Sequence, residues 1–292
     1  MISLIVATLN RVKELERLLS SLERQSYKDF EVILVDQNPD DRLLPALQKY
    51  PAVQIHHLRS ERGLSRARNI GLRAAKGDMI ALPDDDCWYP DQLLETVTEW
   101  FKTHPEFDSL FTGIRTEENK QLAPQWAPGP CRCTMENIWY CAASVTAFMR
   151  TRLIEAVGFF NEGIGQGAPT GYQSGEDLDY FIRFTERGWQ GWYEPSFTVH
   201  HPELQSIERF RRTSHSYALG VGYVLRLHGY SWWYLSKFLI RSCGGATVSL
   251  CKGDMPRAHA YFLRAAGQLQ GYVFGPRDFR RLARSSRTAD IA

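Results

Sequence analysis

The chain has 292 residues, 43% of them hydrophobic and 23% charged, so it can bury a sizeable core and is not intrinsically disordered. No stretch reaches 18 uninterrupted apolar residues, and the N-terminus lacks the basic start and cleavage site of a signal peptide. We therefore expect no membrane span, a cytoplasmic location and no nucleic-acid partner.

The net charge of +2 hides an uneven distribution. Residues 203–292 hold 14 Lys and Arg against 5 Asp and Glu, a net charge of +9, whereas residues 1–202 hold 21 against 28, a net charge of −7. An acidic body with a basic tail indicates a metal-binding catalytic unit beside a region that meets an anionic surface. An ordinary solvated surface is the alternative interpretation.

Strand and helix patterns alternate over the first part of the chain. Ile2–Thr8 is a short apolar run typical of a buried parallel strand, and leucines at helical spacing over 15–22 predict an amphipathic helix with Asn10 as its N-cap. Phe30–Asp36 predicts a second buried strand. The pattern continues with a strand, a helix, a strand, a helix with proline in its first turn, and a strand: Val53–Leu58, Leu64–Lys76, Asp78–Leu82, Pro90–Lys102 and Asp108–Ile114.

This alternation predicts an α/β domain with a mainly parallel sheet. Ligands of such sheets bind outside the carboxyl ends of the strands, which places Thr8, Asp36 and Asp84–Asp86 around one crevice. The rest of the chain predicts a long loop, a strand, a short helix, a glycine-rich stretch, a helix, and a mostly helical tail from about Pro202: Arg115–Tyr140, Ser144–Arg150, Thr151–Gly158, Gly163–Gly175 and Glu176–Arg187.

Three features carry chemistry. The consecutive carboxylates of Asp84, Asp85 and Asp86 repel one another unless a cation or solvent compensates them, and two of them can reach one Mg²⁺ or Mn²⁺ that also binds a diphosphate. Glu176 and Asp177 open a helix, where the helix dipole alone favours acids, but a general base is the functional alternative. The pair His200-His201 ends a strand, and an imidazole beside carboxylates suits Mn²⁺.

Five motifs follow one another over about residues 2–202. They are Val6-Ala7-Thr8-Leu9-Asn10-Arg11, Val35-Asp36, Gly63–Gly71 (GLSRARNIG), Asp84–Pro90 (DDDCWYP) and Gly175–Asp179 (GEDLD). Together they resemble the family 2 glycosyltransferases of GT-A fold, with a Rossmann-like sheet. The resemblance implies inverting transfer of a sugar from a nucleotide-diphospho-sugar, most often a UDP-sugar, with Mn²⁺ or Mg²⁺ as the cofactor.

The resemblance also implies roles for single residues. Those matching the nucleotide-sugar site are Thr8, Asn10, Arg11, Asp36, which recognises the base, Arg68, and Asp84 toward the ribose. The metal ligands would be Asp85, Asp86 and His201, Asp177 would be the catalytic base, and Glu176 would orient the acceptor or the sugar. Ala7 and Pro83 stand where many members have proline and aspartate, so the order of roles within Asp84–Asp86 is left open.

We accordingly expect a catalytic domain at 1–202, with a nucleotide-sugar half over about 1–115 and an acceptor half over about 116–202. The basic, aromatic-rich region 203–292 would contact an anionic membrane near a lipid-linked acceptor, or pack on the catalytic domain or on another subunit. Two rival interpretations are a catalytically silent carbohydrate-binding or scaffold protein, and a nucleotidyltransferase. The latter usually has a glycine-rich loop after the first strand, which Thr8-Leu9-Asn10-Arg11 lacks.

Overall fold

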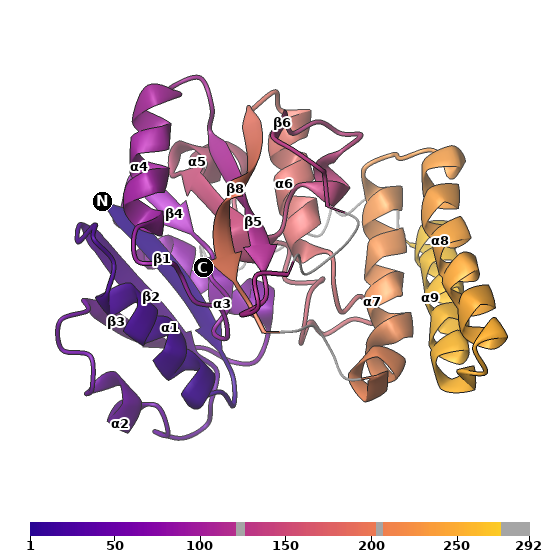
Figure 1. Ribbon diagram of the computed structural model, residues 1–292, viewed down its shortest axis with the longest axis horizontal. Helices are drawn as coiled ribbons and strands as arrows, with labels where there is room; N and C mark the ends of the chain where they lie inside the picture. The colour runs from indigo at the N-terminus through magenta and orange to yellow at the C-terminus, as the bar shows by residue number, and fades with distance from the viewer. Residues whose placement is uncertain (121–125, 203–206, 276–292) are drawn as a thin grey trace, which may run out of the picture. The chain divides into compact units, whose positions relative to one another are not determined.

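The computed structural model describes residues 1–120, 126–202 and 207–275 (Figure 1). The chain forms two compact units, the first from Met1–Phe160 and Tyr180–Leu204 and the second from Asn161–Asp179 and Gln205–Ala292. Parts of the expected loop and of the expected helical tail, at 121–125, 203–206 and 276–292, lie outside the described residues.

A sheet of eight strands forms the centre of the first unit, in the order β3-β2-β1-β4-β7-β5-β8-β6. β7 and β6 run antiparallel to their neighbours, and the remaining described strands are parallel to one another. This confirms the expected mainly parallel α/β class. The strands are β1 (Ile2–Thr8), β2 (Phe30–Asp36), β3 (Ile55–Arg59), β4 (Met79–Ala81), β5 (Ser109–Arg115), β6 (Cys131–Arg132), β7 (Ala147–Arg150) and β8 (Gly191–His200).

The helices that accompany the sheet are α1 (Lys13–Glu23), α2 (Leu44–Leu47), α3 (Leu64–Ala74), α4 (Leu93–Thr103), α5 (Arg152–Val157) and α6 (Glu176–Glu186). Two expectations about their ends are wrong. Val12 occupies the N-cap of α1, and Asn10 lies outside the helix with a left-handed backbone at φ 61°. Pro90 precedes α4, which begins at Leu93. Ser144–Thr146, expected as strand, forms a 3-10 turn before β7.

Both faces of β1 are covered by helices, so its side chains are apolar on both sides. Leu4 and Val6 join a buried cluster with the leucines of α1 on one face of the sheet, as the spacing of these leucines predicts. Ile5 points to the other face and meets α3, where a Cβ on Gly71 would lie 2.3 Å from the Ile5 Cγ2. Glycine at position 71 therefore lets α3 approach the sheet closely.

The second unit contains the helical tail, with α7 (Ile207–Leu227), α8 (Trp232–Cys251) and α9 (Met255–Phe274). This agrees with the expected helical C-terminal region. α7 and α9 pack backbone to backbone, because a Cβ on Gly222 would lie 2.1 Å from the Gln268 carbonyl oxygen and one on Gly271 equally close to that of Leu219. Among the helices described here, none is long and apolar enough to cross a membrane.

Candidate active site

The acidic run after β4 is joined to the end of β8. Trp88 and His200 each donate their N–H to the other's carbonyl over 3.0 Å, and their rings stack with centroids 5.4 Å apart. The Arg17 guanidinium covers the Trp88 ring at 3.2 Å. Because His201 directly follows His200, this pairing brings the His201 imidazole to Asp86.

Asp84, Asp86 and His201 form a cluster whose potential ligand atoms all lie within 4.8 Å of one another. The His201 Nε2 is 3.1 Å from Asp86 Oδ1, and its Nδ1 lies 2.8 Å from the Pro202 carbonyl oxygen, which can only accept. The Nδ1–H therefore donates to this carbonyl, so the Nε2 lone pair of the neutral ring can bind a metal ion. Two carboxylates and one imidazole form a donor set that fits Mn²⁺.

The charges of this cluster depend on its burial. Burial raises the pKa of Asp86, but the His201 imidazole and Arg11 outweigh it, and the resulting pKa is below the ordinary value. Burial lowers the pKa of His201, but its hydrogen bond to Asp86 outweighs this effect and the pKa is raised. The contact between the two side chains thus favours the charged form of each, against the effect of burial.

Asp85 has a different partner. Its Oδ1 accepts a hydrogen bond from Arg11 Nη1 over 2.7 Å, and the same guanidinium also pairs with Asp86. Asp85 is only 6% exposed, and this burial raises its pKa to about 6 although Arg11 opposes the shift. The structure thus brings Asp84–Asp86, Arg11 and His201 into one site. The three side chains whose potential ligand atoms lie close together are those of Asp84, Asp86 and His201, whereas the sequence suggested Asp85 in place of Asp84. Which acids bind a cation stays a prediction.

Asp36, expected to recognise the base, is buried at the end of β2. Its Oδ1 accepts hydrogen bonds from the Asn38 backbone and side-chain nitrogens over 2.8 and 2.7 Å. Its Oδ2 lies 3.0 Å from His57 Nε2 and 3.1 Å from an Arg59 nitrogen, both on β3. Asp36 therefore fixes the loop after β2 and presents a carboxylate that is already compensated by nearby donors.

The loop after β1 is tied to the loop after β2. The buried Thr8 accepts a hydrogen bond at its carbonyl from the Gln37 N–H, over 3.0 Å. The Asn10 N–H donates to the Asn38 side-chain oxygen over 2.8 Å, and the Asn10 side-chain oxygen accepts from Arg42 over 2.8 Å. The residues expected to line a nucleotide are thus held at one edge of the sheet by local bonds.

Arg68 places a buried positive charge beside the acidic run. It lies on α3, its side chain is 3% exposed, and its Nη2 is 2.7 Å from Ser144 Oγ and 3.5 Å from Asp84 Oδ1. A guanidinium held in this way suits a diphosphate. Arg68 therefore lies beside the acidic run, as the sequence suggested. Its role in binding a diphosphate stays a prediction.

Glu176 and Asp177 lie in the first turn of α6 and belong to the second unit. Glu176 is 7% exposed, whereas Asp177 is partly exposed and accepts a hydrogen bond from the Leu178 N–H over 2.8 Å. The helix starts where the sequence predicts it. The approach of these acids to Asp84–Asp86 stays a prediction.

Sequence reasoning missed the residues that orient the expected ligands, namely Trp88 for His201, and Asn38, His57 and Arg59 for Asp36. One signal was available for β3. When β2 and β3 pair in parallel, Asp36 and Arg59 lie directly opposite each other, so the positive charge of Arg59 comes close to the buried acid. The bridge from Trp88 to His200 joins residues far apart in sequence and has no local signal.

The chain matches the model of the family described as "Glycosyl transferase family 2" over residues 3–153. A relative from Haemophilus influenzae, described as an uncharacterized glycosyltransferase, is 29% identical over 201 residues, which are 68% of this chain and 64% of the relative. The match thus spans somewhat less than two thirds of that relative's length.

Two solved structures share the fold. TarS 1–349 from S. aureus, in complex with UDP-GlcNAc, has a TM-score of 0.59 and 16% identity, covering 94% of this chain and 92% of that one. The mannosyltransferase PcManGT from Pyrobaculum calidifontis, in complex with GDP-Man and Mn²⁺, has a TM-score of 0.61 and 16% identity, with 94% and 88% covered. These likenesses confirm the expected GT-A fold.

Proposed function

Because the chain belongs to glycosyl transferase family 2, we propose that it transfers a sugar from a nucleotide-diphospho-sugar to a hydroxyl group of a saccharide or lipid-linked acceptor. The observation that carries the proposal is the convergence of Asp84, Asp86 and His201. They lie next to Arg11 and Arg68, the cations that a diphosphate needs. The expected setting is the assembly of surface polysaccharides, and the expected donor is a UDP-sugar, as bound by TarS. PcManGT, which binds GDP-Man, makes GDP the alternative.

In the proposed mechanism, different side chains bind the diphosphate and activate the acceptor. Asp84, Asp86 and His201 would hold a divalent cation, whose positive charge would stabilise the departing diphosphate. Arg11 leaves its carboxylate partners to bind phosphate oxygens, and Arg68 holds its charge in place beside them. Asp177 accepts the proton of the acceptor hydroxyl on the face opposite the leaving group, so the anomeric carbon inverts in one displacement. Glu176 orients the acceptor or the sugar.

Turnover of the donor tests the proposal. The protein is incubated with a panel of UDP- and GDP-sugars and Mn²⁺ or Mg²⁺, and released nucleoside diphosphate is measured. We expect release with at least one donor, and its loss when EDTA removes the cation. If no nucleoside diphosphate is released with any donor and metal, a carbohydrate-binding or scaffold protein on this fold is favoured. Release of pyrophosphate from a nucleoside triphosphate would favour a nucleotidyltransferase.

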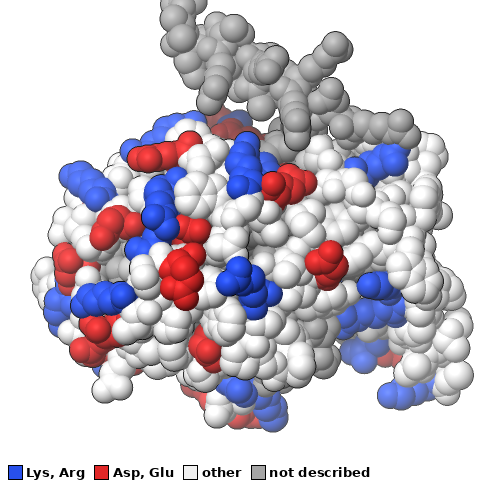
Figure 2. Space-filling model, turned by 90° about the horizontal axis from the view of Figure 1, so that it is seen from above, with Lys and Arg blue, Asp and Glu red and all other residues white. Residues whose placement is uncertain are grey.

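We also propose that the helical unit contacts an anionic membrane that carries the acceptor. Most of the large hydrophobic side chains that the described residues expose lie on α8 and α9, and Trp233 is 73% and Ile240 68% exposed. α8 contains no acidic residue, and Lys237 and Arg241 lie beside its apolar face. Residues 207–275 hold nine Lys and Arg against two Asp and Glu, and Figure 2 shows basic side chains in blue and acidic ones in red. This combination is typical of a helix lying on an anionic bilayer.

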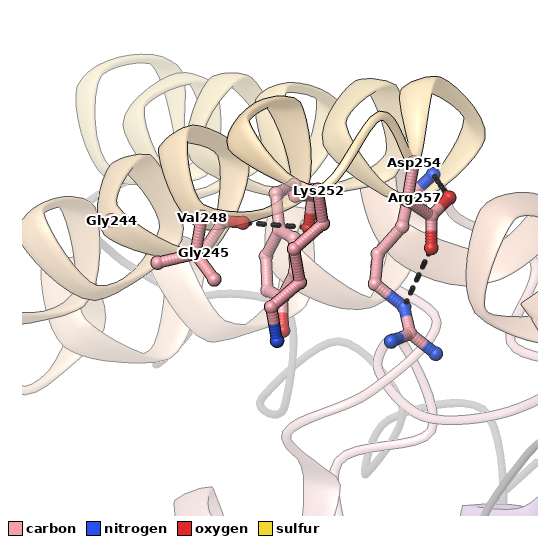
Figure 3. A pocket seen from close by; sticks show the side chains of 8 residues that line it. Gly244, Gly245, Val248, Lys252, Asp254 and Arg257 are labelled. Atoms are coloured by element: carbon pink, nitrogen blue, oxygen red, sulfur yellow. Dashed lines mark hydrogen bonds and ion pairs between the residues drawn. The ribbon is translucent and has the colours of Figure 1, made fainter.

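Two further basic residues lie where α8 meets α9, and one of them, Arg257, pairs with Asp254. A hollow of about 240 Å³ lies between the helices, and Figure 3 shows Lys252 and Arg257 extending to the same side of it. Between them in sequence, Met255 is 63% exposed. An apolar tip flanked by cations suits acyl chains and anionic headgroups together.

Vesicle flotation tests this contact. We expect the protein to float with phosphatidylglycerol vesicles and not with phosphatidylcholine vesicles. Trp233→Ser with Ile240→Ser should abolish flotation, whereas Leu44→Ser, which removes an exposed leucine from the first unit, should leave it unchanged. Self-association of the wild-type protein that the serine pair abolishes, without any flotation, would instead identify this face as a contact between subunits.

A further inference from the structure

The segment that precedes and begins α6 lies along α7 within the second unit. The Ser174 hydroxyl donates to the Tyr217 carbonyl over 2.6 Å. The rings of Tyr172 and Tyr223 stack with centroids 4.3 Å apart. These contacts lie more than one helical turn apart on α7, so the segment is held along the helix and not at a single point.

Two glycines bring the backbones into direct contact. Gly175 has a φ of 93°, and a Cβ there would lie 2.9 Å from the Val224 Cγ2. A Cβ on Gly220 would lie 2.2 Å from the Ser174 carbonyl oxygen. The backbone just before Glu176 therefore has no room to shift toward α7.

A buried acid–histidine pair completes this contact. The Asp179 Oδ1 is 3.0 Å from the Nε2 of His228, which directly follows α7, and these side chains are 3% and 4% exposed. The Asp179 N–H donates to the Gly175 carbonyl over 2.9 Å, within the first turn of α6. A carboxylate buried to this degree needs compensation, and removal of the imidazole would take this buried partner away.

Asp179 and Asp177 point in different directions. Residues two apart on a helix are separated by about 200° around its axis. Because Asp179 faces α7, Asp177 lies on another side of α6, and its side chain is partly exposed. The bond between Asp179 and His228 therefore helps to set the rotation of the first turn, and with it the direction of Asp177.

We propose that His228 is a positioning residue that holds Asp179, and through it the first turn of α6, so that Asp177 faces the reacting hydroxyl. The inference rests on the proposed function, because Asp177 is the base of that reaction. It gives the residue that follows α7 a part in positioning the base, separate from any contact of α8 and α9 with a membrane.

Steady-state kinetics with the best donor provide the first test. His228→Ala should lower kcat by about 10- to 100-fold with the donor KM changed by less than about twofold, because a misplaced base slows the chemical step and leaves donor binding intact. His228→Gln, whose amide N–H can still donate to Asp179, should restore much of kcat. The matched control is His215→Ala, which removes a histidine of α7 that bonds to Gln270 over 3.0 Å.

Hydrogen exchange provides the second test and does not depend on activity. In His228→Ala the amides of residues 171–179 should exchange faster than in the wild type, with α1 unchanged. An inactive wild type would refute the proposed function, and the exchange result would still decide whether His228 holds this segment. An active wild type with unchanged kcat in His228→Ala, or a His228→Gln variant as slow as the alanine variant, would overturn the inference.

Discussion

Asp85→Asn should change how the stability of the protein depends on pH. Burial raises the pKa of Asp85 from an ordinary 3.8 to about 6, and this change corresponds to about 3 kcal/mol. Since the folded pKa is the higher one, the stabilising contribution of this carboxyl is fully present below pH 3.8 and is lost as the pH rises through about 6. The asparagine variant has no such loss.

Urea unfolding at about pH 4 and about pH 7, with EDTA present, measures the effect. Relative to the wild type, Asp85→Asn should gain about 2 kcal/mol of unfolding free energy between the two pH values, because part of the change has already occurred at pH 4. The control Asp41→Asn, which changes a carboxylate with 77% exposure, should differ from the wild type by less than about 0.5 kcal/mol at both. A difference between Asp85→Asn and the wild type that is the same at both pH values would refute the reasoning.

Three further substitutions test other parts of the account. Asp177→Asn should lower kcat by about 10²- to 10⁴-fold while donor affinity, measured by calorimetry, is kept; collapsed affinity with preserved turnover would contradict the assigned base. Trp88→Ala should weaken Mn²⁺-dependent UDP binding by about 10- to 100-fold, because it removes the ring that stacks on His200, the residue before His201, and unchanged binding would refute this link. Gly71→Ala should cost about 1–3 kcal/mol of unfolding free energy, because its Cβ would meet Ile5, and an unchanged urea midpoint would show that α3 can shift freely.

The sequence predicted those parts of the fold that depend on local patterns. The apolar run of β1, the leucines of α1 and the start of α6 at Glu176 are all where periodicity places them. The antiparallel direction of β7 was not predicted, because strand direction depends on pairing with β4 and β5, which are distant in sequence. The two-residue β6 is too short to show a pattern.

The candidate site divides in the same way. Asp84, Asp86 and His201 could be named from motifs, and the structure brings these three side chains together. The pairing of Arg11 with two carboxylates could not be predicted from motifs, because it depends on loops that meet only after folding. The grouping of 161–179 with the C-terminal helices is likewise a long-range effect, and the expected domain boundary at residue 202 stays a prediction.

A crystal structure with UDP and Mn²⁺, using the anomalous signal of manganese, tests the central claim most directly. The account predicts a manganese peak bound by His201 and by carboxylates of the run Asp84–Asp86. It also predicts a diphosphate bound to the cation and the Asp177 carboxylate facing the position of the sugar. A nucleotide bound elsewhere, or Asp177 in a separate solvent region with no shared cleft, would contradict it.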